Sequence, residues 1–158
     1  MLYAVLKLVH LLSLVVWVGG MFFTLTCLRP ALGVLDAPAR PRLMNAVLLR
    51  FFAIVNAAIG LVLASGLGML WLAWRAAAGS ATGWRMPPSW ITMVVLGATM
   101  MAIFGYLRGR PYRHLQAALQ AQDGPSVAAL LARIRAWVTI NLALGVLVIA
   151  VMKLGATA

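Results

Sequence analysis

Four long apolar segments dominate the sequence, and short basic or polar stretches separate them. The segments run from Ala4 to Cys27, Phe51 to Trp74, Trp90 to Leu107 and Trp137 to Leu154. Each is close to the roughly 20 residues that a helix needs to cross the hydrocarbon core of a bilayer. The pattern therefore predicts an all-α, polytopic membrane protein, with residues 1–158 forming a single domain that is a bundle of four transmembrane helices.

Composition supports a membrane protein and excludes two other classes. Hydrophobic residues make up 65% of the chain and charged residues only 9%, whereas soluble domains carry about 25% charged residues. A disordered chain would need low hydrophobicity. The 13 Lys and Arg residues against 2 acidic ones give a formal charge of +11, but they stand between apolar runs and not on a soluble basic surface. We therefore expect no nucleic-acid partner and an attraction to anionic lipids.

The basic residues also predict an orientation, because Lys and Arg are enriched in cytoplasmic loops. The first and third connections hold most of the arginines: Arg29, Arg40, Arg42 and Arg50, then Arg108, Arg110, Arg113, Arg133 and Arg135. These two connections are predicted to face the cytoplasm, so both termini lie outside. In a bacterial inner membrane, the predicted location, the outer side is the periplasm.

The two basic connections are predicted to be largely helical. Arg29 and Pro30 are expected to end the first helix, since proline interrupts the hydrogen-bond ladder. Residues 37–50 then read as a helical extension of the second span. An Asp-Gly-Pro-Ser turn ending at Ser126 is expected to begin another extension, over 126–136, with Ser126 as its cap.

Small and polar residues within the spans suggest how the helices pack. The second span carries a stripe of small residues spaced by three or four: Ala53, Ala57, Gly60, Ala64 and Gly68. Small residues let helix backbones approach closely in lipid, so this stripe is predicted to be a packing face. Asn56 and Asn141 are expected to hydrogen-bond between helices.

Two histidines are the main candidates for chemistry. His10 lies inside the first span, about 10 Å from its outer end, where an ionisable side chain is costly unless it has a partner or a function. His114 lies in the third connection, where a histidine is ordinary. About 30 Å of hydrocarbon core would separate them, so they are not expected to share a site. No span contains Asp or Glu, and Cys27 is the only cysteine, which excludes a carboxylate relay and an internal disulfide.

Methionine thioethers could supply further ligands beside His10. Met69, Met93 and Met152 all lie toward the His10 side of the predicted bundle. Thioether sulfur is a soft ligand for Cu(I), and His/Met pairs also hold haem iron. Methionine is equally a common filler of apolar helices. The candidate metal ligands are therefore His10, Met93, Met69 and Met152.

The first segment resembles a known helix. His10 stands seven residues before Trp17, and Gly19 and Gly20 follow; this segment resembles the first helix of the CopD (copper resistance protein D) family of bacterial inner-membrane proteins. It also resembles the HemJ-type protoporphyrinogen oxidases. CopD membership implies a role in copper homeostasis, and likeness to HemJ implies haem b bound by the histidine that matches His10. The HemJ pattern has a lysine shortly after the tryptophan that opens the third helix, and none follows Trp90 here.

Three hypotheses follow. In the first, the protein handles copper: His10 accepts Cu(I) from the periplasmic side and thioethers complete the site. In the second, it is a haem-dependent membrane oxidoreductase, with His10 as axial ligand of haem b, Met93 or a vacant position opposite, and Trp17 packing nearby. In the third, it is a scaffold without a ligand. The copper hypothesis is favoured, with no enzymatic activity, and a lone four-helix unit is expected to form a homo-oligomer if it provides a path across the membrane.

Overall fold

The computed structural model describes residues 1–78 and 85–154. Its elements are α1 (Leu2–Phe23), a π-helical segment η1 (Thr24–Leu28), α2 (Arg29–Ala31), a 3₁₀ turn η2 (Leu32–Val34), α3 (Ala39–Ala77), α4 (Pro88–Gly109), α5 (Pro111–Gln120) and α6 (Gly124–Leu154). Within these residues four helical stretches are long and apolar enough to cross a membrane. The predicted all-α membrane fold is confirmed.

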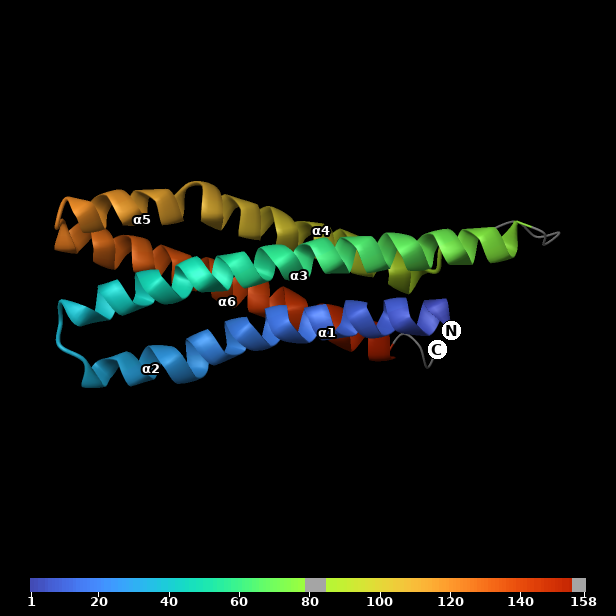
Figure 1. Cartoon of the computed structure of the whole chain (residues 1–158), viewed down its shortest axis with the longest axis horizontal. Helices are drawn as coiled ribbons and strands as arrows, with labels where there is room; N and C mark the ends of the chain where they lie inside the picture. Colours follow the sequence, from blue (N-terminus) through green and yellow to red (C-terminus); the bar gives the residue numbers. More distant parts are fainter. Residues whose placement is uncertain (79–84, 155–158) are drawn as a thin grey trace.

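The helices form an elongated bundle (Figure 1). α1 packs mainly against α3, α4 packs against α6, and α5 continues the direction of α4 and also packs against α6. The N terminus and the end of α6 lie at one end of the bundle, while the connections from α2 to α3 and from α5 to α6 lie at the other. Residues 1 and 154 therefore lie at the same end of the bundle. Which side of the membrane that end faces stays a prediction.

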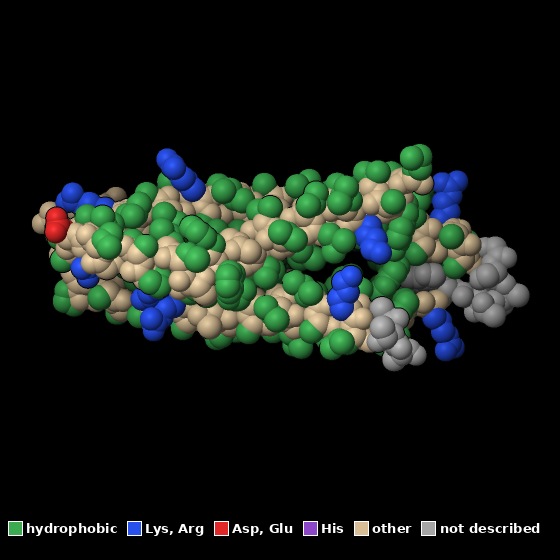
Figure 2. Space-filling model, turned by 90° about the horizontal axis from the view of Figure 1, so that it is seen from below, with side chains coloured by type: hydrophobic (Ala, Val, Ile, Leu, Met, Phe, Trp, Pro, Cys, Tyr) green, Lys and Arg blue, Asp and Glu red, His purple; other side chains and the backbone are tan. Residues whose placement is uncertain are grey.

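The outside of the bundle is suited to lipid. Figure 2 shows a face covered by hydrophobic side chains along its middle, with Lys and Arg side chains gathered toward the two ends. Large apolar residues such as Leu12, Val15 and Phe22 on α1 are exposed. An apolar band between two charged ends matches the hydrocarbon core and the two headgroup layers of a bilayer.

Aromatic side chains fill the centre. Trp17 of α1 meets Phe104 of α4 edge-on, with ring centroids 6.3 Å apart. Phe52 of α3 packs against Phe104 at 5.7 Å and against Tyr112 of α5 at 5.0 Å, both in T-shaped geometry. Such pairs are a favourable arrangement of aromatic quadrupoles, and here they join four helices.

Four of the five residues in the predicted packing stripe of the second span lie outside the bundle, and only Gly68 meets α1. Ala53, Ala57, Gly60 and Ala64 are exposed, and a Cβ added at Gly60 would meet nothing within 4 Å. The buried face of α3 instead carries larger side chains: Met44, Leu48, Phe52, Val55, Ala58, Val62 and Ser65. The centre of a four-helix bundle is wide enough to need such side chains, whereas small residues favour only the close approach of two backbones. The prediction was wrong for these four residues.

The expected interhelical hydrogen bonds of the two asparagines are not formed among the described residues. Asn56 is exposed on the outer face of α3. Asn141 of α6 is 2% exposed, and its Oδ1 has no hydrogen-bond partner in the described part of the chain. Asn56 lies on the same outward face of α3 as the small-residue stripe. Its hydrogen bond was wrongly predicted because this face was expected to turn inward.

The first helix does not end at Arg29 and Pro30, as was predicted. The helical path continues through η1, α2 and η2 as far as Val34. Pro30 stands in the first turn of α2, where the missing N–H of proline is tolerated. Just before it, the π-helical segment has already interrupted the regular hydrogen-bond ladder.

The two helical extensions begin at slightly different residues from those predicted. α3 begins at Ala39 and not at 37, and α6 begins at Gly124 and not at 126. Ser126 is not the cap of α6; its backbone N–H donates to Oδ1 of Asp123 at 3.1 Å. Asp123 therefore satisfies a free N–H of the first turn, as an N-terminal capping carboxylate does.

Candidate metal site at His10

His10 lies on the inner face of α1. The buried residues of this helix are His10, Ser13, Trp17 and Met21, whose spacing of three and four places them on one helical face. This face is turned toward α3, the main packing partner of α1. His10 is 8% exposed, so the imidazole is held between the two helices and is not free in lipid.

The Nδ1 atom of His10 is fixed by α3. It lies 3.1 Å from the carbonyl oxygen of Val62 and 3.1 Å from Oγ of Ser65. A carbonyl oxygen only accepts hydrogen bonds, so the bond to Val62 requires the proton on Nδ1. In the neutral imidazole this leaves Nε2 without a proton, with a lone pair available to a ligand.

Ser65 supports the same protonation state. Its hydroxyl donates to backbone carbonyls of its own helix, at Leu61 and Val62. With its proton directed to these carbonyls, Oγ can accept from Nδ1–H of His10. Metal-binding histidines usually donate the second ring N–H to such a neighbour, which fixes the ring and raises the basicity of the ligating nitrogen.

A glycine lets α3 approach the imidazole. A Cβ added at Gly66 would lie 3.3 Å from Cε1 of His10 and 3.6 Å from Nδ1. Two residues closer to the end of α3, a Cβ at Gly68 would lie 3.0 Å from Cδ1 of Leu6. These two glycines fix where the outer halves of α1 and α3 meet, and hence where His10 reaches Ser65.

The three predicted thioether ligands lie at the same end of the bundle as His10. Met69 is half-buried and follows Ser65 by four residues, on the same face of α3. Met93, near the start of α4, and Met152, near the end of α6, both pack against the hydrophobic core. Of the three, only Met69 lies on α3, the helix that hydrogen-bonds the imidazole of His10.

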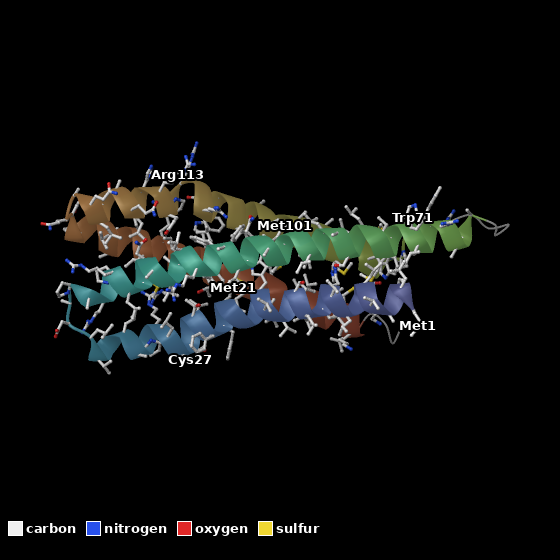
Figure 3. The ribbon with its side chains drawn as sticks, in the orientation of Figure 1. Met1, Met21, Cys27, Trp71, Met101 and Arg113 are labelled. Atoms are coloured by element: carbon white, nitrogen blue, oxygen red, sulfur yellow. The ribbon has the colours of Figure 1, made fainter. Side chains whose placement is uncertain are left out.

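Other chemistry-bearing residues lie apart from this site. Trp17 is about 10 Å from His10 along the helix axis and belongs to the aromatic core with Phe104. His114 is exposed on α5, at the opposite end of the bundle. Cys27 is exposed, whereas Met21 on the same helical path is buried (Figure 3). Among the described residues no group of three or more His, Cys, Asp or Glu could hold a metal ion. The candidate ligands beside His10 are the methionine thioethers.

Val62, Ser65 and Gly66 were not identified from the sequence as partners of His10. Ser65 was the available signal, because it is a hydroxyl residue within an apolar span, as Ser13 is on α1. Antiparallel pairing of neighbouring helices would have placed it at the depth of His10. The carbonyl of Val62 has no sequence signal of its own.

A comparison with protein families identifies the chain. The family model described as Copper resistance protein D matches residues 45–154. The chain belongs to the CopD family. The match covers most of α3 and all of α4, α5 and α6. Val62, Ser65 and Gly66, the residues of α3 beside His10, lie within it. α1 and His10 lie before it.

No curated protein and no solved structure gives a significant match. Membership of the CopD family and four apolar helices together make this a multi-pass membrane protein of a copper resistance family.

Proposed function

We propose that this CopD-family protein binds Cu(I) through Nε2 of His10, with methionine thioethers completing the site. The observation that carries the proposal is the pair of contacts at Nδ1, to Val62 and Ser65, which leave Nε2 as the ligating atom. Imidazole and thioether are ligands suited to Cu(I). Copper is here the cargo of a membrane protein and not a resident catalytic group.

Met69 is proposed as the first thioether ligand. It lies on the same face of α3 as Ser65. Its sulfur could therefore reach a copper ion bound on the outer side of His10. Met93 and Met152, from α4 and α6, are proposed as further ligands. These ligands come from four helices and are brought together only in the folded bundle. Copper binding would therefore stabilise the folded state.

His10 lies in the first half of α1, toward the end of the bundle where α1 begins and α6 ends (Figure 1). By the distribution of arginines this end faces the periplasm of a bacterial inner membrane. Copper would therefore enter from the periplasmic side, and passage across the membrane would require a homo-oligomer or a partner.

The test is a Cu(I) competition titration of the purified protein against a chromophoric Cu(I) chelator. His10→Ala is expected to abolish the high-affinity site, and His114→Ala is the matched control because it removes the other histidine, exposed and at the opposite end. Met69→Leu, which nearly conserves volume, is expected to weaken binding, while Met101→Leu in the middle of α4 should leave it unchanged. Equal affinities of wild type and His10→Ala would overturn the proposal.

The haem alternative uses the same atom of His10 as axial ligand, so the same protein preparations test it. The observation that favours it is again the lone pair of Nε2. An absorbance spectrum of protein expressed with ample haem, oxidised and then reduced with dithionite, decides between the two. A Soret band that disappears in His10→Ala would make the protein a haem-b oxidoreductase and reject copper as its main ligand. If His10→Leu leaves the protein's function in the cell unchanged, the third hypothesis, a scaffold without a ligand, would be favoured.

A further inference from the structure

An apolar cavity lies at the end of the bundle opposite to His10. It has a volume of about 120 Å³ and opens between the end of the first helical stretch, the start of α3 and the first half of α6. Apolar side chains form most of its wall, among them Leu25, Leu32, Met44, Leu131 and Ile134. Such a wall suits a hydrocarbon chain better than a free polar ligand.

Three arginines line the same cavity. They are Arg29 of α2, Arg40 of α3 and Arg135 of α6. Arg29 is half-buried, and Arg135 lies close enough for the two positive charges to repel one another. Three separate elements thus bring guanidinium groups to the edge of one apolar cavity, and a negative charge placed between them would relieve this repulsion.

The protein does not neutralise these charges itself. Nε of Arg40 donates to the carbonyl of Leu35 at 2.8 Å and Nη2 donates to that of Gly33 at 3.2 Å; both acceptors are uncharged. The whole chain has only two acidic residues, and no ion pair to the three arginines occurs among residues 1–78 and 85–154. Within the described chain, the charge at this cavity is therefore positive.

The π-helical segment η1 helps to place Arg29 at the cavity. A π turn contains more residues than an α turn, so it rotates the residues that follow it around the helix axis. After η1, Arg29 shares the cavity with Leu25 and Leu32, which lie four residues before it and three after it. Single π turns within α-helices are rare and often occur at functional sites.

From this geometry we infer that the cavity binds one anionic phospholipid of the surrounding bilayer. The phosphate lies between Arg29, Arg40 and Arg135, which offer charge-assisted and bidentate hydrogen bonds. One acyl chain lies along the wall formed by Leu25, Leu131 and their apolar neighbours. The positions of the arginines at the charged end of the bundle match the headgroup layer. This site is independent of His10 and of copper.

The test is native mass spectrometry of the full-length protein released from detergent micelles. The protein is titrated with phosphatidylglycerol, with phosphatidylcholine of the same acyl chains and, separately, with inorganic phosphate. We expect phosphatidylglycerol to bind at least roughly tenfold more tightly than phosphatidylcholine, given the contribution of basic residues to binding anionic headgroups. Equal binding of the two lipids would overturn the inference.

Two variants that remove the same number of charges distinguish binding at this cavity from a general attraction between basic residues and anionic lipid. R29Q/R40Q/R135Q is expected to lose the preference for phosphatidylglycerol. R108Q/R110Q/R113Q removes the same charge from exposed arginines that do not line the cavity, and Arg113 points away from the bundle (Figure 3); it is expected to keep the preference. Equal losses in both variants would mean that the attraction is unspecific and would reject the site.

A third variant tests the apolar wall and keeps the inference testable if the arginine variant fails to fold. Leu131→Trp fills the cavity while all three guanidinium groups stay. It is expected to weaken binding of phosphatidylglycerol. If it does not, and inorganic phosphate binds as tightly as the lipid, the site takes a free anion and not a phospholipid, and the inference is wrong.

Discussion

The imidazole of His10 lies against the backbone of α3 at Gly66, where an added Cβ would come within 3.3 Å of Cε1. Four residues earlier on α3, the carbonyl of Val62 accepts the hydrogen bond of Nδ1. A helix with a side chain at position 66 would have to move away from this ring. The glycine thus allows the contact that sets which nitrogen of His10 is free.

Gly66→Val is expected to lower Cu(I) affinity by roughly 10- to 100-fold, the usual cost of disturbing a group that orients a metal ligand. Its methyl groups would displace the imidazole from Val62. Gly60→Val is the control, because a Cβ there meets nothing within 4 Å. Competition titration of both variants checks the prediction, and equal affinities would show that Gly66 does not position His10.

Gly145 of α6 also lies at a close contact between helices. An added Cβ would lie 2.8 Å from Cγ2 of Val18 and 3.2 Å from Cε of Met100. Met100 can move its flexible end, but Val18 is β-branched and stiff in a helix. Gly145→Ala should therefore lower stability by about 1–2 kcal/mol, because overpacking exceeds the gain in helix propensity.

Thermal unfolding in detergent measures this effect. Gly105→Ala on α4 is the matched control, since nothing lies within 4 Å of its added Cβ; it should gain about 0.5–1 kcal/mol from helix propensity alone. Should Gly145→Ala unfold at a higher temperature than wild type, α6 would not contact Val18 as described.

The number of membrane-spanning helices could be predicted from the sequence, but not which of their faces turn inward. In a soluble helix the polar face marks the outside. In α3 both faces are apolar, so Ala57 and Gly60 looked as suitable for packing as Phe52 and Val55. The polar residues within spans were better guides on α1, where His10 and Ser13 are both buried. Ser65 obeys the same rule.

The candidate site was only partly predictable for a related reason. The depth of His10 and the end of the bundle that holds Met69, Met93 and Met152 follow from residue numbers and helix rise. Contacts to the carbonyl of Val62 depend on the rotation and register of two helices, which no local pattern encodes. The π-helical segment was also missed, because its sequence TLTCL has no distinctive signal.

Asn141 leads to a prediction of increased stability. Its side chain is 2% exposed and its Oδ1 has no partner among the described residues. Leaving a buried polar atom without a hydrogen bond costs about 1–3 kcal/mol, so Asn141→Leu should raise the unfolding temperature. Asn56→Leu, at an exposed position on α3, is the comparison and should change stability less. A loss of stability in Asn141→Leu would indicate that Oδ1 binds something in the native membrane.

The turn between α5 and α6 contains Gln122 with a φ of 55°. This left-handed conformation is costly for residues with a Cβ and free for glycine. The N–H of Asp123 donates to the carbonyl of Ala118 at 3.0 Å, as at many helix ends with a left-handed residue. Gln122→Gly should therefore stabilise the turn by roughly 1 kcal/mol, measurable as a higher unfolding temperature; Gln120→Gly, in the last turn of α5, should have the opposite sign.

Asp123 makes the start of α6 sensitive to acid. The hydroxyl and the backbone N–H of Ser126 lower the pKa of the Asp123 carboxyl, whereas an unfolded aspartate titrates near about 3.9. A carboxyl with a lowered folded pKa stabilises the folded state above the unfolded pKa, and this contribution is lost as the pH falls through the folded pKa. Hydrogen exchange in the first turn of α6, corrected for the intrinsic rate, should thus accelerate below about pH 4. Asp123→Asn keeps a capping oxygen that does not titrate, so its exchange should not depend on pH in this way. The same acceleration in that variant would assign the effect to another group.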